Sequence, residues 1–228
     1  NNLMKINIIE TALRIAIEAH KNQTRKGDDQ PYIIHPVMVA LKLKNYNFPD
    51  KVIAAALTHD VLEDTDYPVE KLRKELGDEV LEIIKAVTND QSLPWEEKKK
   101  KYVESVRNAS EGAKAVAVAD KIHNLESLFI AYEEQGPALW KRFNRGKDKK
   151  VWFEKEVLQM LKDTWRHPMI EEYERLITKI TKLKAKQKPD TSSVSAMLSP
   201  SEIEQLQQSA KDANDFFQKV FAAKKRVN

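Results

Sequence analysis

One stretch indicates how this chain folds: Ala55-Ala56-Leu57-Thr58-His59-Asp60-Val61-Leu62-Glu63-Asp64-Thr65. It carries the pair His59-Asp60 at the end of an otherwise apolar helix. Asp60, Glu63 and Asp64 follow at i, i+3 and i+4, so they share one face of a helix. Three like charges are costly to bury together unless a cation compensates them. The stretch therefore predicts a buried helix that ends at a site for a metal ion or another cation.

Two other segments bring side chains of the same kind. His35 precedes Pro36, which fits the first turn of a helix, so we expect His35 at a helix start. Asp120 belongs to a long helix predicted from about Ala113 to Glu134. The chain has five histidines and no cysteine, so any metal site consists of His, Asp and Glu, which suits Mn²⁺, Fe²⁺ or Zn²⁺. We predict that one divalent ion is bound by four side chains: His35, His59, Asp60 and Asp120.

The same long helix carries a polar strip. Asp120, Asn124 and Ser127 are spaced at i, i+4 and i+7 among largely apolar neighbours, and such a strip usually faces a site or a buried network. We expect Asn124 and Ser127 to reach a substrate that is bound beside the metal. Three further histidines are interpreted as packed, hydrogen-bonded residues: His20, His123 and His167.

Composition favours one helical domain. A chain of 228 residues can bury a substantial core, and without cysteine that core depends on no disulfide. Only 5 glycines, with many Ala, Leu, Lys and Glu residues, predict an all-α fold. The N-terminus shows an amphipathic stretch in place of a signal sequence, and no apolar run reaches the ~20 residues of a membrane span. We expect a soluble cytoplasmic protein.

The chain divides into three parts by pattern. We predict a helical domain over 1–186, a linker over 187–199 and a C-terminal amphipathic helix over 200–228. Ser199 and Glu202 form a capping box at the start of that helix. Its apolar stripe is expected to pack on the protein's own core in preference to a partner. Before the linker, two helical segments are expected after Gly136-Pro137: 138–163 and 168–186.

The charge of the chain is unevenly distributed. The net charge is only +4, but 141–188 contains 15 Lys and Arg against 7 Asp and Glu. A solvated helical face is the ordinary interpretation of such a segment. A positive rim that attracts a polyphosphate is the alternative. Nucleic acid is a weaker third interpretation, because the segment has no recognisable binding motif.

Several motifs, taken in order, resemble those of a known family. They are Arg25-Lys26, Pro31-Tyr32-Ile33-Ile34-His35-Pro36, the stretch 55–65, Val87-Thr88-Asn89-Asp90, Leu93-Pro94 and Ala119-Asp120-Lys121-Ile122-His123-Asn124-Leu125. The four predicted metal-binding side chains are similar to the ligands of the HD-domain metal-dependent phosphohydrolases. The whole set resembles the RelA/SpoT hydrolase branch, and within it the stand-alone small alarmone hydrolases of the metazoan SpoT homologue type. The resemblance covers about residues 5–135 and continues less closely to about 165.

The resemblance implies a fold and a reaction. The fold is an HD-domain helical bundle, here with an additional C-terminal helix. The reaction is hydrolysis of the 3′-pyrophosphate of guanosine tetra- or pentaphosphate to GDP or GTP and pyrophosphate, with Mn²⁺ as the usual metal. Glu63 and Asp64 would orient the attacking water or exchange its proton. Arg25 and Lys26 would clamp the pyrophosphate. The partner is then a small nucleotide, with neither nucleic acid nor membrane, and a chain without room for a synthetase domain is expected to hydrolyse only.

Some positions depart from the family pattern. Trp95 stands where a lysine is expected, and Lys98 or Lys99 from the next turn could replace it. Glu126 occupies a place usually held by a basic residue, which makes the local charge less favourable to phosphates. The segment Arg142-Phe143-Asn144-Arg145-Gly146-Lys147 could supply positive charge in compensation. These departures concern substrate choice more than catalysis.

Two other functions remain open from the sequence. A nucleotide phosphatase, acting for instance on the 2′-phosphate of NADPH, would use the same metal site. A non-catalytic module would sense a nucleotide and pass the signal to a partner through the C-terminal helix. The presence of both Glu63 and Asp64 favours an enzyme, because a sensor has no need of carboxylates that activate water.

Overall fold

A computed structural model describes residues 7–25 and 30–185, together with 199, 201, 204, 205, 208, 211 and 212. Within these residues the chain is helical and forms no β-strand, so the predicted all-α class is confirmed. The elements are α1 (Ile8–Ala19), α2 (Ile34–Asn45), α3 (Asp50–Thr58), α4 (Val61–Asp64), α5 (Val69–Leu76), α6 (Asp78–Val87), α7 (Trp95–Arg107), α8 (Glu111–Gln135), the 3₁₀ helix η1 (Gly136–Arg142), α9 (Gly146–Thr164) and α10 (Pro168–Lys182).

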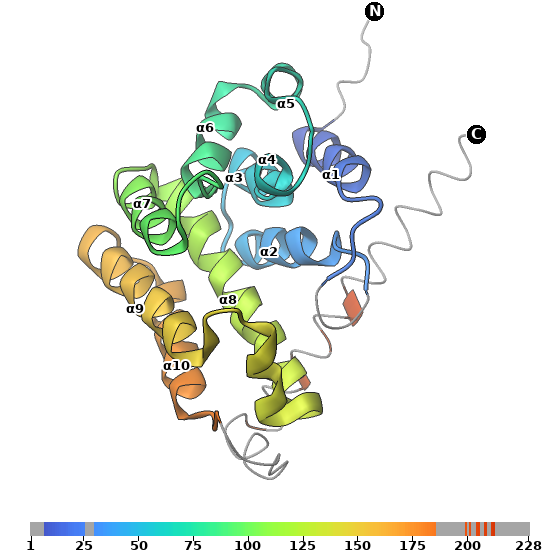
Figure 1. Cartoon of the computed structure of the whole chain (residues 1–228). Helices are drawn as coiled ribbons and strands as arrows, with labels where there is room; N and C mark the ends of the chain where they lie inside the picture. Colours follow the sequence, from blue (N-terminus) through green and yellow to red (C-terminus); the bar gives the residue numbers. More distant parts are fainter. Residues whose placement is uncertain are drawn as a thin grey trace, which may run out of the picture.

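The helix α3 lies at the centre of one half of the molecule, where α1, α2 and α6 pack around it (Figure 1). Every residue from Val52 to Thr58 is buried, as expected for a helix that is apolar on all sides. Pro49 lies just before the first turn, and the helix does not continue on the N-terminal side of this proline. The helix ends at Thr58, and His59 is its C-cap. His59 and Asp60 therefore lie directly after a buried helix.

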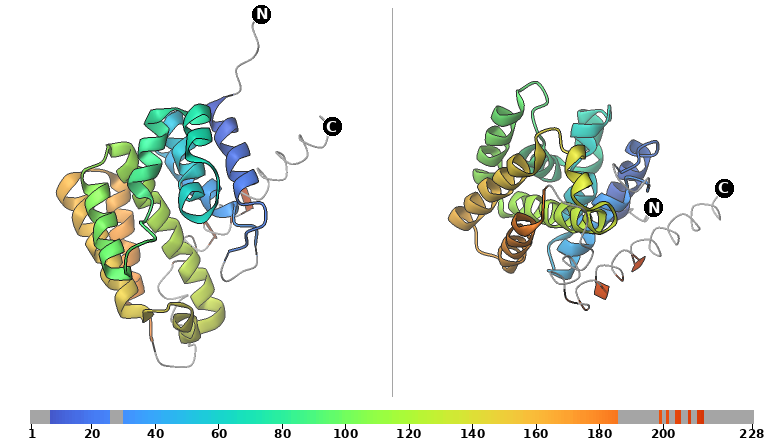
Figure 2. Two further views of the ribbon diagram at one scale, coloured as in Figure 1. Left: turned by 45° about the horizontal axis from the view of Figure 1, so that its top comes forward. Right: turned by 60° about the horizontal axis from the view of Figure 1, so that its bottom comes forward.

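The long helix α8 connects the helices around α3 with the α9–α10 pair. Both views in Figure 2 show α8 between the α9–α10 pair and the side formed by α1 and α2. Ser110 caps its first turn by accepting a hydrogen bond from the backbone N–H of Ala113. A Cβ at Gly112 would lie only 3.0 Å from Cγ2 of Val52, so glycine permits the close approach of α8 to α3. That approach brings Asp120 towards the end of α3.

One predicted helix is divided in the structure. The segment predicted as a continuous helix over 138–163 consists of η1, a short break and then α9. Phe143 is extended, and Gly146 has φ of +69°, a conformation that other residues adopt at a cost. Hydrophobic periodicity did not reveal the break. Its consequence is functional, because the break places Arg142 and Arg145 beside the site described below.

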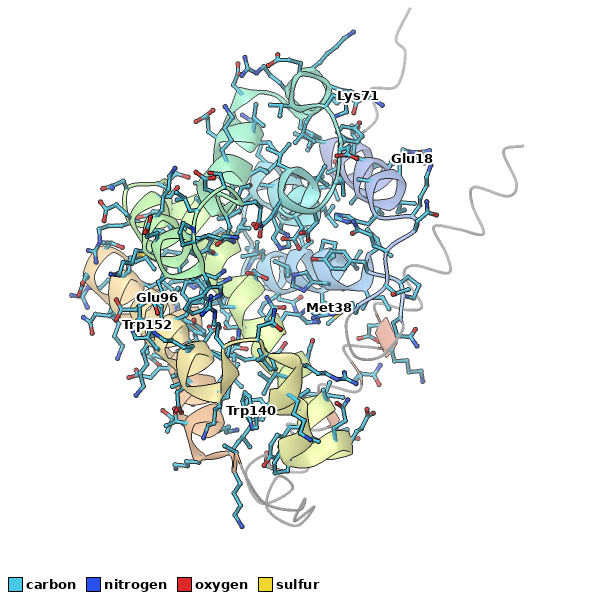
Figure 3. The ribbon with its side chains drawn as sticks, viewed as in Figure 1. Glu18, Met38, Lys71, Glu96, Trp140 and Trp152 are labelled. Carbon is cyan, nitrogen blue, oxygen red and sulfur yellow. The ribbon has the colours of Figure 1, made fainter. Side chains whose placement is uncertain are left out.

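The helices α7 and α9 pack against each other at the surface of the protein. Figure 3 labels Glu96 of α7 and Trp152 of α9 in this region. Lys149 forms an ion pair with Glu96 at 2.5 Å, and the rings of Trp95 and Trp152 are 5.8 Å apart. Trp95, where a lysine was expected, therefore packs against α9.

The predicted linker over 187–199 and helix over 200–228 lie almost wholly outside the described residues. The described positions 201, 204, 205, 208, 211 and 212 are helical and exposed. The apolar stripe of that helix is not among them, so its docking stays a prediction. Across the part of the chain that is described, no helix has the length and apolar character needed to cross a bilayer.

Candidate functional site

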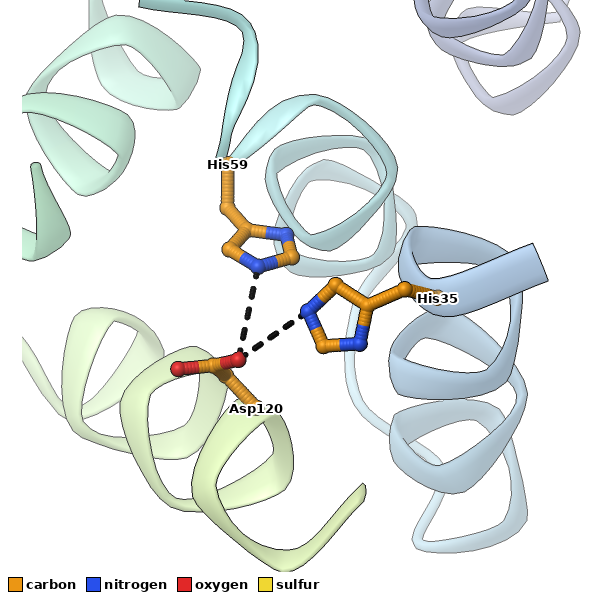
Figure 4. Close-up of side chains that lie close together, drawn as sticks. All are labelled: His35, His59 and Asp120. Atoms are coloured by element: carbon orange, nitrogen blue, oxygen red, sulfur yellow. Dashed lines mark ion pairs between the residues drawn. The ribbon is translucent and has the colours of Figure 1, made fainter. Parts of the chain in front are cut away.

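Four of the predicted side chains meet at one point, although they come from three separate segments. His35 lies in the first turn of α2, His59 and Asp60 join α3 to α4, and Asp120 lies midway along α8. Nε2 of His35 is 3.1 Å from Oδ1 of Asp120 and 3.5 Å from Oδ2 of Asp60. Nε2 of His59 is 3.1 Å from the Asp60 oxygen and 3.7 Å from the Asp120 oxygen. Figure 4 shows both imidazoles directed at the Asp120 carboxylate.

This arrangement fits a divalent ion. Donor atoms bound at about 2.1 Å to one ion lie roughly 3.0–3.5 Å from one another, close to the separations found here. His35, His59 and Asp120 are all buried, and their donor atoms lie within 4.8 Å of one another. Nε2 of His59 is buried without a hydrogen-bond partner among the described residues, so a bound ion would satisfy an atom that is otherwise unsatisfied. Two imidazoles and two carboxylates suit a borderline metal with open positions for water and substrate.

Neighbouring groups fix the protonation of this centre. Nδ1 of His59 donates a hydrogen bond to the Ala56 carbonyl oxygen at 2.7 Å, which leaves Nε2 to face the carboxylates. Burial disfavours the charged imidazole, but Asp60 and Asp120 outweigh it and raise the pKa of His59 well above its ordinary value. Burial likewise opposes ionisation of Asp120, yet Lys121, whose Nζ is 2.8 Å away, helps to hold the pKa of Asp120 well below its ordinary range. Without a cation, His59 therefore carries the compensating proton.

Metal affinity is expected to rise with pH, because an ion must displace that proton from His59. Below the raised pKa of His59 the affinity for Mn²⁺ should fall by about tenfold per pH unit for one released proton, and it should level off above that pKa. Calorimetric titration in two buffers of different ionisation enthalpy measures the protons released. Release of no proton at pH 7 would contradict this assignment.

The two carboxylates that follow the motif point to different partners. Glu63 accepts hydrogen bonds from the backbone N–H of Asn89 at 2.7 Å and from the side chain of Gln91 at 2.8 Å. The hydroxyl of Tyr32 donates to Oδ2 of Asp60 at 2.6 Å and lies 3.2 Å from Oδ2 of Asp64. Burial, together with repulsion from Asp60 and Glu63, raises the pKa of Asp64 to about 6. A carboxyl group with that pKa can exchange protons near neutral pH.

The four converging side chains lie at the wall of a cavity of about 740 Å³. Glu63 and Asp64 border the same cavity, and their catalytic role stays a prediction. The same cavity is also lined by five cationic side chains: Lys99, Lys121, Arg142, Arg145 and Lys150. The carboxylates of the candidate metal centre and these cations therefore border one cavity, an arrangement suited to a metal-bound polyphosphate.

The residues predicted to bind substrate are distributed unevenly around this cavity. Asn124 lines it, and its amide donates to Oδ1 of Asp120 at 2.6 Å. Arg25 reaches the same region from the loop after α1, with Nη2 3.4 Å from Oδ1 of Asn124. Ser127 is one turn further along α8, where its hydroxyl donates to the His123 carbonyl oxygen at 2.9 Å. Lys26 lies outside the described residues, so its role stays a prediction.

A second, smaller cavity of about 320 Å³ continues from the first. The two share Asn124, Arg142, Phe143 and Lys150. Arg25, Ser127 and Glu134 also line the smaller one, together with apolar side chains of α8 and η1. It therefore offers apolar surface as well as charged groups beside the larger cavity, as a nucleotide needs for its nucleoside and phosphate parts.

The structure explains the departures from the family pattern. Glu126 points away from both cavities and accepts a hydrogen bond from Lys42 at 3.1 Å, so its charge is already paired. Lys99 lines the larger cavity, whereas Lys98 bonds to Gln91. Burial, followed by the charge of Lys121, lowers the pKa of Lys99 to about 8. Of the two lysines proposed to replace the one missing at Trp95, Lys99 is the one that faces the site.

Sequence reasoning assigned no role to three residues that contact the centre: Tyr32, Lys121 and His123. Tyr32 and Lys121 bond to Asp60 and Asp120, respectively. His123 was interpreted as a packed histidine, yet its Nδ1 is 2.8 Å from Nδ1 of His35. All three belong to the quoted motifs, so position in a motif was the signal that could have found them.

The fold and this centre together define a helical metal-dependent hydrolase domain. Comparison with known families agrees: the chain belongs to the HD-domain family, whose profile matches residues 12–144. The resemblance noted from the motifs is thereby confirmed.

Individual relatives narrow the class. Guanosine-3′,5′-bis(diphosphate) 3′-pyrophosphohydrolase MESH1 of Danio rerio is 42% identical over 124 residues, which are 53% of this chain and 68% of that protein. The structure is similar to that of a metazoan ortholog of SpoT that hydrolyzes ppGpp and plays a role in starvation responses, with a TM-score of 0.65, 29% identity, and coverage of 81% of this chain and all of that one. The crystal structure of lmo0812 from Listeria monocytogenes EGD-e is also similar, with a TM-score of 0.61, 34% identity, and coverage of 65% of this chain and 99% of that one.

Proposed function

We propose that this protein is a Mn²⁺-dependent hydrolase that removes the 3′-pyrophosphate from guanosine tetra- or pentaphosphate. One observation carries the proposal: His35, His59, Asp60 and Asp120 converge in a cavity that lysine and arginine side chains also line. The names of the relatives support the substrate. The substrate is a small nucleotide, so the reaction requires neither nucleic acid nor membrane, and a cytoplasmic location fits it.

The four converging side chains would hold the ion. When bound, a divalent metal lowers the pKa of a coordinated water from 15.7 to about 7 and neutralises charge on phosphoryl oxygens. Imidazole and carboxylate ligands are compatible with Mn²⁺, whereas a structural zinc site would favour thiolates, which this chain lacks.

Glu63 and Asp64 would manage the proton in the reaction. The water oxygen attacks the phosphorus bonded to the 3′ oxygen, and the bond between that phosphorus and the 3′ oxygen breaks. Glu63, held by Asn89 and Gln91, would orient the water and accept its proton. Asp64, with its pKa raised to about 6, is suited to deliver a proton to the departing 3′ oxygen. The products are GDP or GTP and pyrophosphate.

The cationic residues would bind the phosphates. Arg25 and Lys26 would approach from the loop after α1, with Arg25 able to form a forked pair of hydrogen bonds. Arg142 and Arg145 line the same cavity as the four converging side chains. Asn124 and Ser127, which line the smaller cavity, would contact the nucleoside.

Removing one of these cations should weaken substrate binding without stopping the chemistry. Arg142 borders both cavities, so in the Arg142→Ala variant we expect KM to rise by about 10- to 100-fold with little change in kcat, from loss of one charge-assisted hydrogen bond. The neighbouring exposed residue gives a matched control, Lys141→Ala, which removes a charge that lines neither cavity. An equal effect in both variants would show that the position of Arg142 has no importance.

The substrate itself is tested by a panel. Purified protein is incubated with Mn²⁺ and guanosine tetraphosphate, NADPH or nucleoside triphosphates, and the release of pyrophosphate and of phosphate is followed separately. The proposal predicts pyrophosphate from guanosine tetraphosphate. If NADPH were the only compound hydrolysed, with release of phosphate, the protein would instead be a nucleotide phosphatase. If protein that binds Mn²⁺ released neither product from any compound, the remaining interpretation would be a non-catalytic module that senses a nucleotide.

A further inference from the structure

The second nitrogen of His35 contacts another histidine. Nδ1 of His35 is 2.8 Å from Nδ1 of His123, and the two rings are stacked with centroids 5.0 Å apart. Both side chains are buried, with 3% and 8% of the residue exposed. Figure 4 shows the other nitrogen of His35 directed at Asp120, so the ring connects the candidate metal centre to His123.

Hydrogen-bond chemistry determines which histidine donates. Nη1 of Arg25 lies 3.2 Å from the same Nδ1 of His123. A guanidinium group donates hydrogen bonds and cannot accept them, so Nδ1 of His123 must be an acceptor. Nδ1 of His35 then carries the proton in the bond between the two rings. The remaining nitrogen of His35, Nε2, lies 3.1 Å from Oδ1 of Asp120 and 3.5 Å from Oδ2 of Asp60, where its lone pair would bind an ion held by these carboxylates.

The Nδ1 atom of His59, the other histidine of the centre, is also a hydrogen-bond donor, but its acceptor is of a different kind. Nδ1 of His59 donates to the carbonyl oxygen of Ala56, one turn earlier in its own helix. This acceptor belongs to the backbone, so no side-chain substitution removes it. The partner of His35 is a side chain, so a single substitution can remove it.

We propose that His123 is a positioning residue, which holds His35 in the tautomer that presents Nε2 to the divalent ion. The inference rests on the proposed metal site and deepens it. The same Nδ1 atom also contacts Arg25, a residue proposed to bind phosphate, so the two donors share its one lone pair, with the shorter contact to His35. One imidazole therefore sets both a metal ligand and a substrate contact.

Two substitutions of His123 separate hydrogen bonding from packing. His123→Phe keeps a ring but removes the acceptor, whereas His123→Asn can place an amide oxygen near the position of Nδ1. We expect Mn²⁺ affinity, measured by calorimetry, to fall about 10- to 100-fold in the Phe variant, as for other partners of metal-bound histidines, and to recover largely in the Asn variant. Tyr132→Phe is the matched control, because it removes a buried hydrogen bond, to the Lys184 carbonyl oxygen, from the same helix.

Nuclear magnetic resonance reads the tautomer directly in the metal-free protein. A long-range proton–nitrogen correlation spectrum should show the proton of His35 on Nδ1 in the wild type, and a changed or mixed tautomer in the Phe variant. A wild-type His35 protonated on Nε2 alone overturns the inference, even if the Phe variant does not fold. Wild-type Mn²⁺ affinity in a folded Phe variant also overturns it, as does a wild-type protein that binds no Mn²⁺. Metal binding with the expected tautomer but no hydrolysis of guanosine tetraphosphate would refute the proposed substrate and leave this inference intact.

Discussion

Replacement of His59 by alanine is expected to abolish turnover and to weaken Mn²⁺ binding by more than about 100-fold, beyond the range for loss of an outer hydrogen-bond partner. His59 supplies the buried Nε2 atom that has no hydrogen-bond partner among the described residues, and this atom lies within 3.7 Å of both carboxylates. Its loss also leaves Asp60 and Asp120 facing each other without the proton that His59 carries. Calorimetric titration with Mn²⁺ and pyrophosphate release measure the two effects.

A histidine outside the cavity provides the control for this experiment. His167 accepts a hydrogen bond from the backbone N–H of Met169 at the start of α10, and asparagine can serve the same capping role. His167→Asn should therefore retain metal binding and turnover. A folded His59→Ala protein with normal Mn²⁺ affinity would remove His59 from the centre, and circular dichroism decides whether it is folded.

The Glu63→Gln variant should separate metal binding from catalysis. Glu63 lines the cavity but is not one of the converging ligands, so Mn²⁺ affinity should remain at the wild-type level. Loss of a group that moves the proton of the attacking water should lower kcat by about 100- to 10,000-fold. Glutamine preserves the size of the side chain and one acceptor oxygen for Asn89, so the surrounding loop should stay in place.

An exposed glutamate of α7 gives the matched control, Glu97→Gln, which removes a negative charge away from the cavity. Its kcat should equal that of the wild type. If Glu63→Gln retained full kcat, Asp64 would become the only candidate of the pair for moving protons, and the role given to Glu63 would have to be abandoned.

Much of the candidate site was predictable because its motifs are local. His59 and Asp60 are adjacent, and Glu63 and Asp64 follow in the next turn, so their proximity depends only on helix geometry. The fold class was equally accessible, since few glycines and helical periodicity indicate an all-α chain without reference to tertiary contacts. The family resemblance supplied what periodicity could not, namely which distant segments meet.

Other features depend on packing that no local pattern encodes. Glu126 counted against phosphate binding from its charge alone, but Lys42 of α2 pairs with it across the helix interface. The break between η1 and α9 depends on a positive φ at Gly146, and the hydrophobic pattern continues through it. His123 looked like an ordinary buried histidine until its neighbours, His35 and Arg25, were in view.

The sequence by itself determined that this chain is helical, that it has no thiolate ligands, and that histidine and carboxylate side chains are presented at helix ends. These properties follow from composition and from interactions within one or two turns. Only the tertiary structure decided at what distances α2, α3 and α8 hold those side chains, that Lys99 and Arg142 line the same cavity, and that His123 contacts His35. Such contacts join residues that are far apart in the sequence, for example Arg25 and Asn124 at a separation of 99 positions, and their geometry is set by how the helices pack.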